Sequence, residues 1–149
     1  MAYALNTDVA AEFKNIAFTV TSFVTTTDVD NFITQMDALI NSYVGAKYVV
    51  PITADASSVA LMQLFCVTLV ADKIKRILEN RQATNTQTTQ EVRGAYTTKD
   101  VMNALNMIKK GELVLSGATL ISGSGNGVMF SNNVANEVEP EFEKALEQW

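Results

Sequence analysis

Apolar side chains recur every three or four residues along several stretches of the chain, which is the spacing of one face of a helix. The clearest stripe follows Thr27-Asp28 and consists of Val29, Phe32, Ile33, Met36, Leu39, Ile40 and Tyr43. Polar residues such as Asp30 and Gln35 stay off this stripe. The pattern predicts an amphipathic helix that ends near Gly45, where we expect the left-handed backbone that glycine favours after a helix.

A second stretch, residues 54–80, predicts one long helix that begins at the polar sequence around Asp55. Its first half is apolar on nearly every face, from Val59 to Val70, whereas its second half sets Ile74 and Ile77 against charged residues. A helix that is apolar all round has to be surrounded, either by its own domain or by a neighbouring subunit.

Two shorter helices complete the predicted bundle. The polar start Asn6-Thr7-Asp8 predicts a helix over about residues 8–15, and the capping sequence Thr97-Thr98-Lys99-Asp100 predicts one that closes at Gly111. Residues 16–27 are rich in β-branched side chains and predict an extended connector or a short strand. The predicted fold class is therefore mainly α, a small helical bundle of about four helices.

The chain changes character after residue 111, which divides it into a helical domain, residues 1–111, and a long extended C-terminal arm, residues 112–149. Short β-strands and a terminal helix over 141–149 are compatible with the arm sequence. Apolar residues stand in its glycine-rich background: Leu113, Leu115, Leu120, Ile121, Val128, Met129 and Phe130. Arms of this kind dock on another surface by strand addition or in pockets, so these residues are candidate partner or oligomer contacts. Trp149 is either a further anchor or a loose end.

Composition argues against catalysis. The 149 residues include no His and one Cys, so the commonest general base is missing and an internal disulfide cannot form. Cys66 lies in the apolar half of the long helix, where we expect a core residue rather than a nucleophile. The glycine-rich segment 123–127 lacks the flanking pattern of a phosphate-binding loop. We therefore expect no enzyme activity, no cofactor, no metal site and no membrane segment.

The net charge of −5 hides three blocks of alternating sign. Residues 1–72 carry −5, residues 73–110 carry +5 and residues 111–149 carry −5. Opposed patches can neutralise each other within a chain or pair between copies, and an unevenly charged solvated surface is the simpler alternative. The basic block contains the residues Lys73, Lys75, Arg76, Arg81 and Arg93. They are candidates for DNA phosphates, or else form a solvated helix face or ion pairs with a neighbouring subunit, and the lack of interleaved aromatic residues argues against DNA.

Three sequence pieces follow each other along the chain: DNFITQMDALINSYVGAKYVVPI, ADKIKRILEN and IKKGELVL. With this order the chain resembles the head–tail connector proteins (adaptor or head-completion proteins) of tailed bacteriophages over roughly residues 6–116. The best-matching positions are Ile40, Tyr43, Val44, Tyr48, Pro51 and the turn Gly111-Glu112-Leu113. The chain departs from the family pattern in residues 83–97 and after Ser116.

The resemblance implies a structural virion protein that forms a homo-oligomeric ring, commonly of about twelve copies, beneath the portal at the neck of the particle. The implied partners are other copies, the portal protein and a tail, stopper or tail-terminator protein, with DNA only as passing cargo. Before assembly the protein would reside in the host cytoplasm. The alternative function is a nucleic-acid-binding helical regulator that uses the basic segment 73–93.

Overall fold

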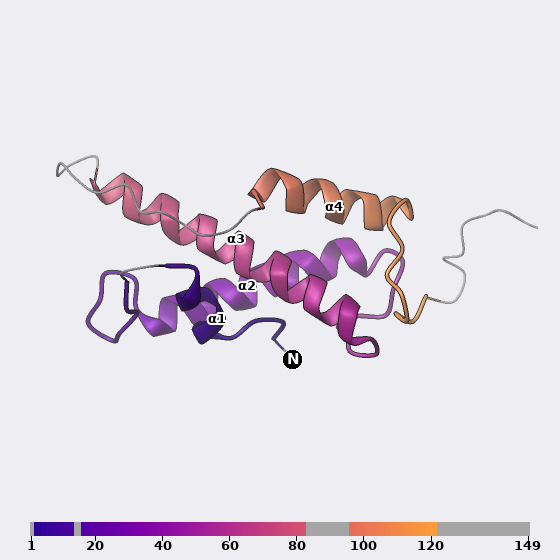
Figure 1. Cartoon of the computed structure of the whole chain (residues 1–149), viewed down its shortest axis with the longest axis horizontal. Helices are drawn as coiled ribbons and strands as arrows, with labels where there is room; N and C mark the ends of the chain where they lie inside the picture. Colours follow the sequence, from indigo (N-terminus) through magenta and orange to yellow (C-terminus); the bar gives the residue numbers. More distant parts are fainter. Residues whose placement is uncertain (1, 14–15, 83–95, 122–149) are drawn as a thin grey trace, which may run out of the picture.

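The computed structural model describes residues 2–13, 16–82 and 96–121, which form four helices and no β-strand. The helices are α1 (Asn6–Ala11), α2 (Thr26–Val44), α3 (Ala56–Gln82) and α4 (Thr98–Lys110). Helices α2 and α3 form a central pair, and α1 and α4 each pack against both of them. In Figure 1, α1 and α4 lie on opposite sides of this pair. The prediction of a mainly helical fold with about four helices is therefore confirmed.

Helix α2 begins with a reciprocal cap. The Asp28 amide donates a hydrogen bond to the Thr25 hydroxyl (3.2 Å), and the Thr25 amide donates to the Asp28 carboxylate (2.9 Å). The predicted stripe supplies the buried face, but the prediction for Gly45 is wrong because its φ is −63°, in the right-handed region. The chain continues into a further turn there, and a Cβ on Gly45 would lie 2.6 Å from the Asn41 carbonyl oxygen. Glycine is suited to this position because it has no side chain to clash with the Asn41 carbonyl, not because the backbone is left-handed.

Helix α3 is the central core element, and the Asp55 carboxylate caps it by accepting from the Ser58 amide (2.9 Å). Its apolar half contributes many of the buried core residues: Met62, Phe65, Cys66, Val67, Leu69, Val70 and Ala71. By length and composition alone Ala56–Asn80 would suffice to cross a membrane, and about half of it is buried inside the fold. The other helices of the chain thus surround much of this apolar surface.

The remaining helices differ in how well the sequence predicted them. Helix α4 has the expected cap at Thr97 and the expected left-handed Gly111, with φ 82°. Helix α1 starts earlier and is shorter than predicted. No strand forms in residues 16–25, where the Thr19 amide instead donates to the Ser22 hydroxyl (2.6 Å) and closes a local turn. Because these polar side chains bind the local backbone, the connector has a turn in place of strand pairing.

Residues 113–121, here called the closing segment, fold back against the connection between α2 and α3. The Leu115 amide donates to the buried Tyr48 hydroxyl (3.0 Å), and the Ser58 hydroxyl donates to the Ser116 carbonyl (2.8 Å). Leu115 itself is only 3% exposed and belongs to the hydrophobic core. The first residues of the predicted arm are therefore part of the helical domain's own packing.

The far end of the closing segment pairs with the chain that follows α2. An isolated antiparallel bridge joins Tyr48 and Leu120. The Val49 amide donates to the Thr119 carbonyl (2.8 Å), and the Ile121 amide donates to the Lys47 carbonyl (2.9 Å). This contact is too short to form a strand, and it holds the end of the closing segment against the chain that follows α2.

Candidate interaction surfaces

An open groove of about 380 Å³ lies between α2, α3 and the first turn of α4, and we call it the α2–α4 groove. Its apolar wall is formed by Met36, Leu39, Leu69 and Ile77. Its polar rim is formed by Asp72, Lys73, Arg76, Asn80 and Thr98. The groove therefore offers apolar contact area with two cations and one carboxylate around it.

The charged side chains of the rim are held in place by contacts within the chain. The Asp72 carboxylate accepts a hydrogen bond from the Thr98 hydroxyl (2.6 Å), which ties the start of α4 to α3. The same carboxylate forms an ion pair with Arg76 (2.9 Å), whose side chain is 68% exposed. Lys73 donates to the Gln35 side-chain oxygen (2.6 Å) and lies over the Phe32 ring, 4.2 Å from its centre.

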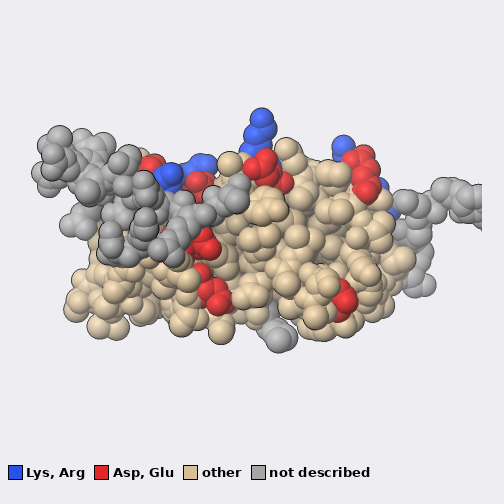
Figure 2. Space-filling model, in the orientation of Figure 1, with Lys and Arg blue, Asp and Glu red and all other residues tan. Residues whose placement is uncertain are grey.

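The predicted basic block is only partly within the described residues. Lys73 and Arg76 line the groove, whereas Lys75 forms an ion pair with Glu79 (3.8 Å) one turn along α3. The side chain of Arg81 and all of Arg93 lie outside the described residues. Figure 2 shows Lys and Arg side chains along the upper edge of the molecule, with Asp and Glu among them, above a face that carries only a few acidic patches. Exposed ion pairs contribute little stability, so these cations retain the capacity to bind a partner.

The predicted contact residues of the arm fall into three groups. Leu113 packs partly buried against the core, and Leu115 lies inside it and contributes to the chain's own packing. Leu120 (54% exposed) and Ile121 remain at the surface beside the bridge. The other predicted contacts, Val128, Met129, Phe130 and Trp149, lie outside the described residues, as does the predicted terminal helix.

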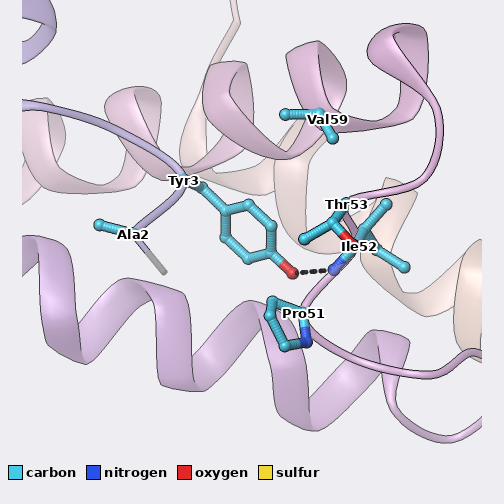
Figure 3. Close-up of a pocket in the computed structure, with 6 residues that line it drawn as sticks. All are labelled: Ala2, Tyr3, Pro51, Ile52, Thr53 and Val59. Atoms are coloured by element: carbon cyan, nitrogen blue, oxygen red, sulfur yellow. Dashed lines mark hydrogen bonds between the residues drawn. The ribbon is translucent and has the colours of Figure 1, made fainter.

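A smaller cavity of about 110 Å³ lies beneath the N-terminal segment, as Figure 3 shows. Tyr3 is its central polar residue: its hydroxyl donates to the Asn41 side-chain oxygen (2.7 Å) and accepts from the Ile52 amide (2.9 Å). Burial raises the pKa of the Tyr3 phenol, so the group stays protonated at neutral pH. The arrangement fastens the N-terminal segment to the start of the α2–α3 connection.

Cys66 is buried, as the sequence predicted, and its pKa is raised by burial and by the nearby negative charge of Asp37. Asp37 is itself buried, and one of its carboxylate oxygens accepts from the Tyr3 amide (3.2 Å). The other oxygen finds no hydrogen-bond partner among the described residues. Within those same residues, no three His, Cys, Asp or Glu side chains gather in a way that could hold a metal ion.

The sequence did not predict the groove, because the pattern of each single helix already explained the positions of the groove residues. Met36 and Leu39 belong to the stripe of α2, and Leu69 belongs to the apolar half of α3. Their common surface arises only from how the helices cross. The sequence did indicate part of the charged rim, since Lys73 and Arg76 belong to the predicted basic block.

The fold and these surfaces define a small, mainly helical domain with a charged-rimmed groove and a non-helical closing segment. The family model of bacteriophage Mu Gp36 matches residues 3–129. Because this match spans most of the chain, the protein belongs to the bacteriophage Mu Gp36 family and is a phage protein. No curated protein and no solved structure matches the chain. The expectation of a phage protein is confirmed, and the head–tail connector role is a finer assignment that the family description does not state.

Proposed function

We propose that the protein is a structural component of the virion, a head-to-tail adaptor subunit whose copies form a ring under the portal. In this function the ring joins the capsid to a tail, stopper or tail-terminator protein and lets DNA pass through its centre. The protein acts by contact and needs no cofactor. It is located at the neck of the particle and, before assembly, in the host cytoplasm.

The observation that carries this proposal is the family match over residues 3–129, a phage family, together with the resemblance to connector proteins over residues 6–116. Opposed charge blocks add support, because a ring needs two complementary surfaces on every subunit. The α2–α4 groove and the surface residues Leu120 and Ile121 supply candidate surfaces of this kind.

The test is the size and shape of the full-length protein, measured by light scattering and negative-stain electron microscopy, alone and with the portal protein of the same phage. We expect rings, either free or assembled on the portal. A protein that stays monomeric at high concentration and ignores the portal would overturn the proposal. A truncated variant should end after Ile121, because ending at residue 111 would remove Leu115 from the core.

The rival function, a nucleic-acid-binding regulator, makes a different prediction. Binding through the basic segment would fall steeply with salt and would weaken in a variant with Lys75→Ala and Arg76→Ala. Both side chains already form ion pairs along α3, with Glu79 and Asp72 respectively. These pairs are exposed and leave both cations able to bind a partner, so the DNA-binding measurement decides, and absence of DNA binding at low salt would eliminate the rival.

A further inference from the structure

We infer that the α2–α4 groove receives the acidic C-terminal segment of a second copy of this chain, residues 137–149, here called the tail segment. The inference rests on one part of the proposed function, namely that copies of the chain assemble with each other. It goes beyond that proposal by assigning both halves of the contact to particular residues.

The groove specifies the chemistry of its occupant. Its wall of Met36, Leu39 and Ile77 calls for apolar side chains, and a volume of about 380 Å³ accommodates only a few large ones. At the rim, the Asp72 carboxylate already has the Arg76 guanidinium and the Thr98 hydroxyl as partners. The exposed donors of Arg76 and the ammonium of Lys73 therefore favour carboxylates on the incoming segment.

The tail segment has this combination of side chains. Its charged residues are Glu137, Glu139, Glu141, Glu143, Lys144 and Glu147, an excess of acids over bases. Its large apolar residues Phe142, Leu146 and Trp149 follow each other at spacings of four and three, which places them on one face if the segment is helical. A short amphipathic segment with anchors at this spacing is a common occupant of helical grooves.

The groove and the last described residue of the chain lie in different parts of the domain. The groove adjoins Thr98, the first residue of α4, whereas the described part of the chain ends at Ile121, which pairs with Lys47 beyond the end of α2. Helix α4 alone spans about 20 Å between these regions, and Figure 1 shows its two ends well separated. If the tail segment of one copy occupies the groove of the next, the contact is head-to-tail and closes into a ring when repeated.

The chain's own tail segment is the competing occupant, because residues 122–141 can span up to about 66 Å when extended. Engineered cysteines in the full chain separate the two cases. One population carries Asn80→Cys at the groove rim and another carries Gln148→Cys in the tail segment, and the two are mixed and oxidised. Cys66 is buried and stays out of the reaction.

We expect disulfide-linked heterodimers from this mixture. The matched control replaces Asn80→Cys by Val20→Cys, an 81% exposed position in the connector between α1 and α2, and should give far fewer. Cross-linking no stronger than this control overturns the inference. In a chain that carries both Asn80→Cys and Gln148→Cys, a predominantly intramolecular disulfide also overturns it, since the groove would then hold the chain's own tail segment.

Charge reversal gives an independent test on the full chain. Arg76→Glu and Lys75→Glu make the same change in charge, and each removes one ion pair along α3, but only Arg76 lines the groove. At low salt we expect Arg76→Glu to raise the concentration of half-assembly about tenfold, and Lys75→Glu to change it less than about threefold. Glu143→Lys should restore part of the loss caused by Arg76→Glu. Circular dichroism checks that each variant is folded.

The outcomes separate this inference from the proposed function. Rings that bind the portal but respond equally to Arg76→Glu and Lys75→Glu, without cross-links above the control, refute the groove contact and leave the adaptor function standing. Cross-linked copies that form no ring and ignore the portal support the groove contact and refute the adaptor function.

Discussion

Replacing Tyr3 by Phe removes a single hydroxyl from the join between the N-terminal segment and the α2–α3 connection. The aromatic ring of residue 3 is retained, so the packing around the cavity stays the same. Two hydrogen bonds are lost, one from the buried Ile52 amide (2.9 Å) and one to the Asn41 side-chain oxygen (2.7 Å). The measured effect is therefore the free energy of polar groups left without partners.

The size of the effect follows from burial. Ile52 is only 3% exposed, so the loss of the partner of its amide costs about 1–2 kcal/mol. The Asn41 oxygen is half-buried and recovers part of its loss from solvent, which leaves a smaller cost of about 0.5 kcal/mol. We expect Tyr3→Phe to lower the free energy of unfolding by about 2 kcal/mol.

Urea unfolding followed by far-UV circular dichroism measures this difference. The matched control is Tyr96→Phe, since Tyr96 is exposed at the surface, and its effect should stay within about 0.5 kcal/mol. If Tyr3→Phe also stayed within about 0.5 kcal/mol, the N-terminal segment would not be fastened by this hydroxyl and the reasoning would be refuted.

Three further predictions concern local features of the fold. Gly117→Ala should lower the free energy of unfolding by about 1–3 kcal/mol in urea unfolding, because φ is +67° and the new Cβ would meet the Asp55 Cβ at 2.8 Å; an unchanged midpoint would contradict this. Hydrogen bonds from the Thr97 side chain and backbone hold the pKa of Asp100 below the ordinary aspartate value of 3.8. The stabilising effect of Asp100 is therefore present above that pH and is lost as the pH falls through the lower pKa of the folded state. Asp100→Asn should therefore lower the thermal midpoint at neutral pH and make it fall less steeply in acid. If the midpoints of the variant and the original protein fell in parallel with pH, the Asp100 cap would not contribute to stability. Burial raises the pKa of the Cys66 thiol, so a colorimetric thiol reagent at about pH 8 should react only after urea is added; rapid reaction of the native protein would show that the site is open.

The helices were predictable where their signals are local. The caps at Thr25 and Thr97 and the left-handed Gly111 depend on residues within a few positions of each other, so sequence alone locates α2 and α4 closely. Asp55 marks the start of α3 for the same reason. The error at Gly45 has the same origin, since a local rule cannot tell whether the chain turns left-handed or continues into another right-handed turn.

The closing segment and the groove were not predictable, because they depend on contacts between residues far apart in the chain. Leu115 and Tyr48 are separated by 67 positions, and nothing near Leu115 marks it as a core residue rather than part of an arm. Met36 and Leu69 likewise meet at one surface only because α2 and α3 cross there. Residue patterns report which face of a helix is buried, but not which parts of that face stay uncovered.

The closing segment also determines how mechanical tension would enter the domain. A pull on the chain beyond residue 121 meets the Ile121–Lys47 and Val49–Thr119 hydrogen bonds first, and then the buried Leu115–Tyr48 bond. Because the load reaches the α2–α3 connection before it reaches α4, the helices are held together while these few bonds bear the force. If a partner holds the chain beyond residue 121, the strength of these few hydrogen bonds determines the force at which the subunit yields.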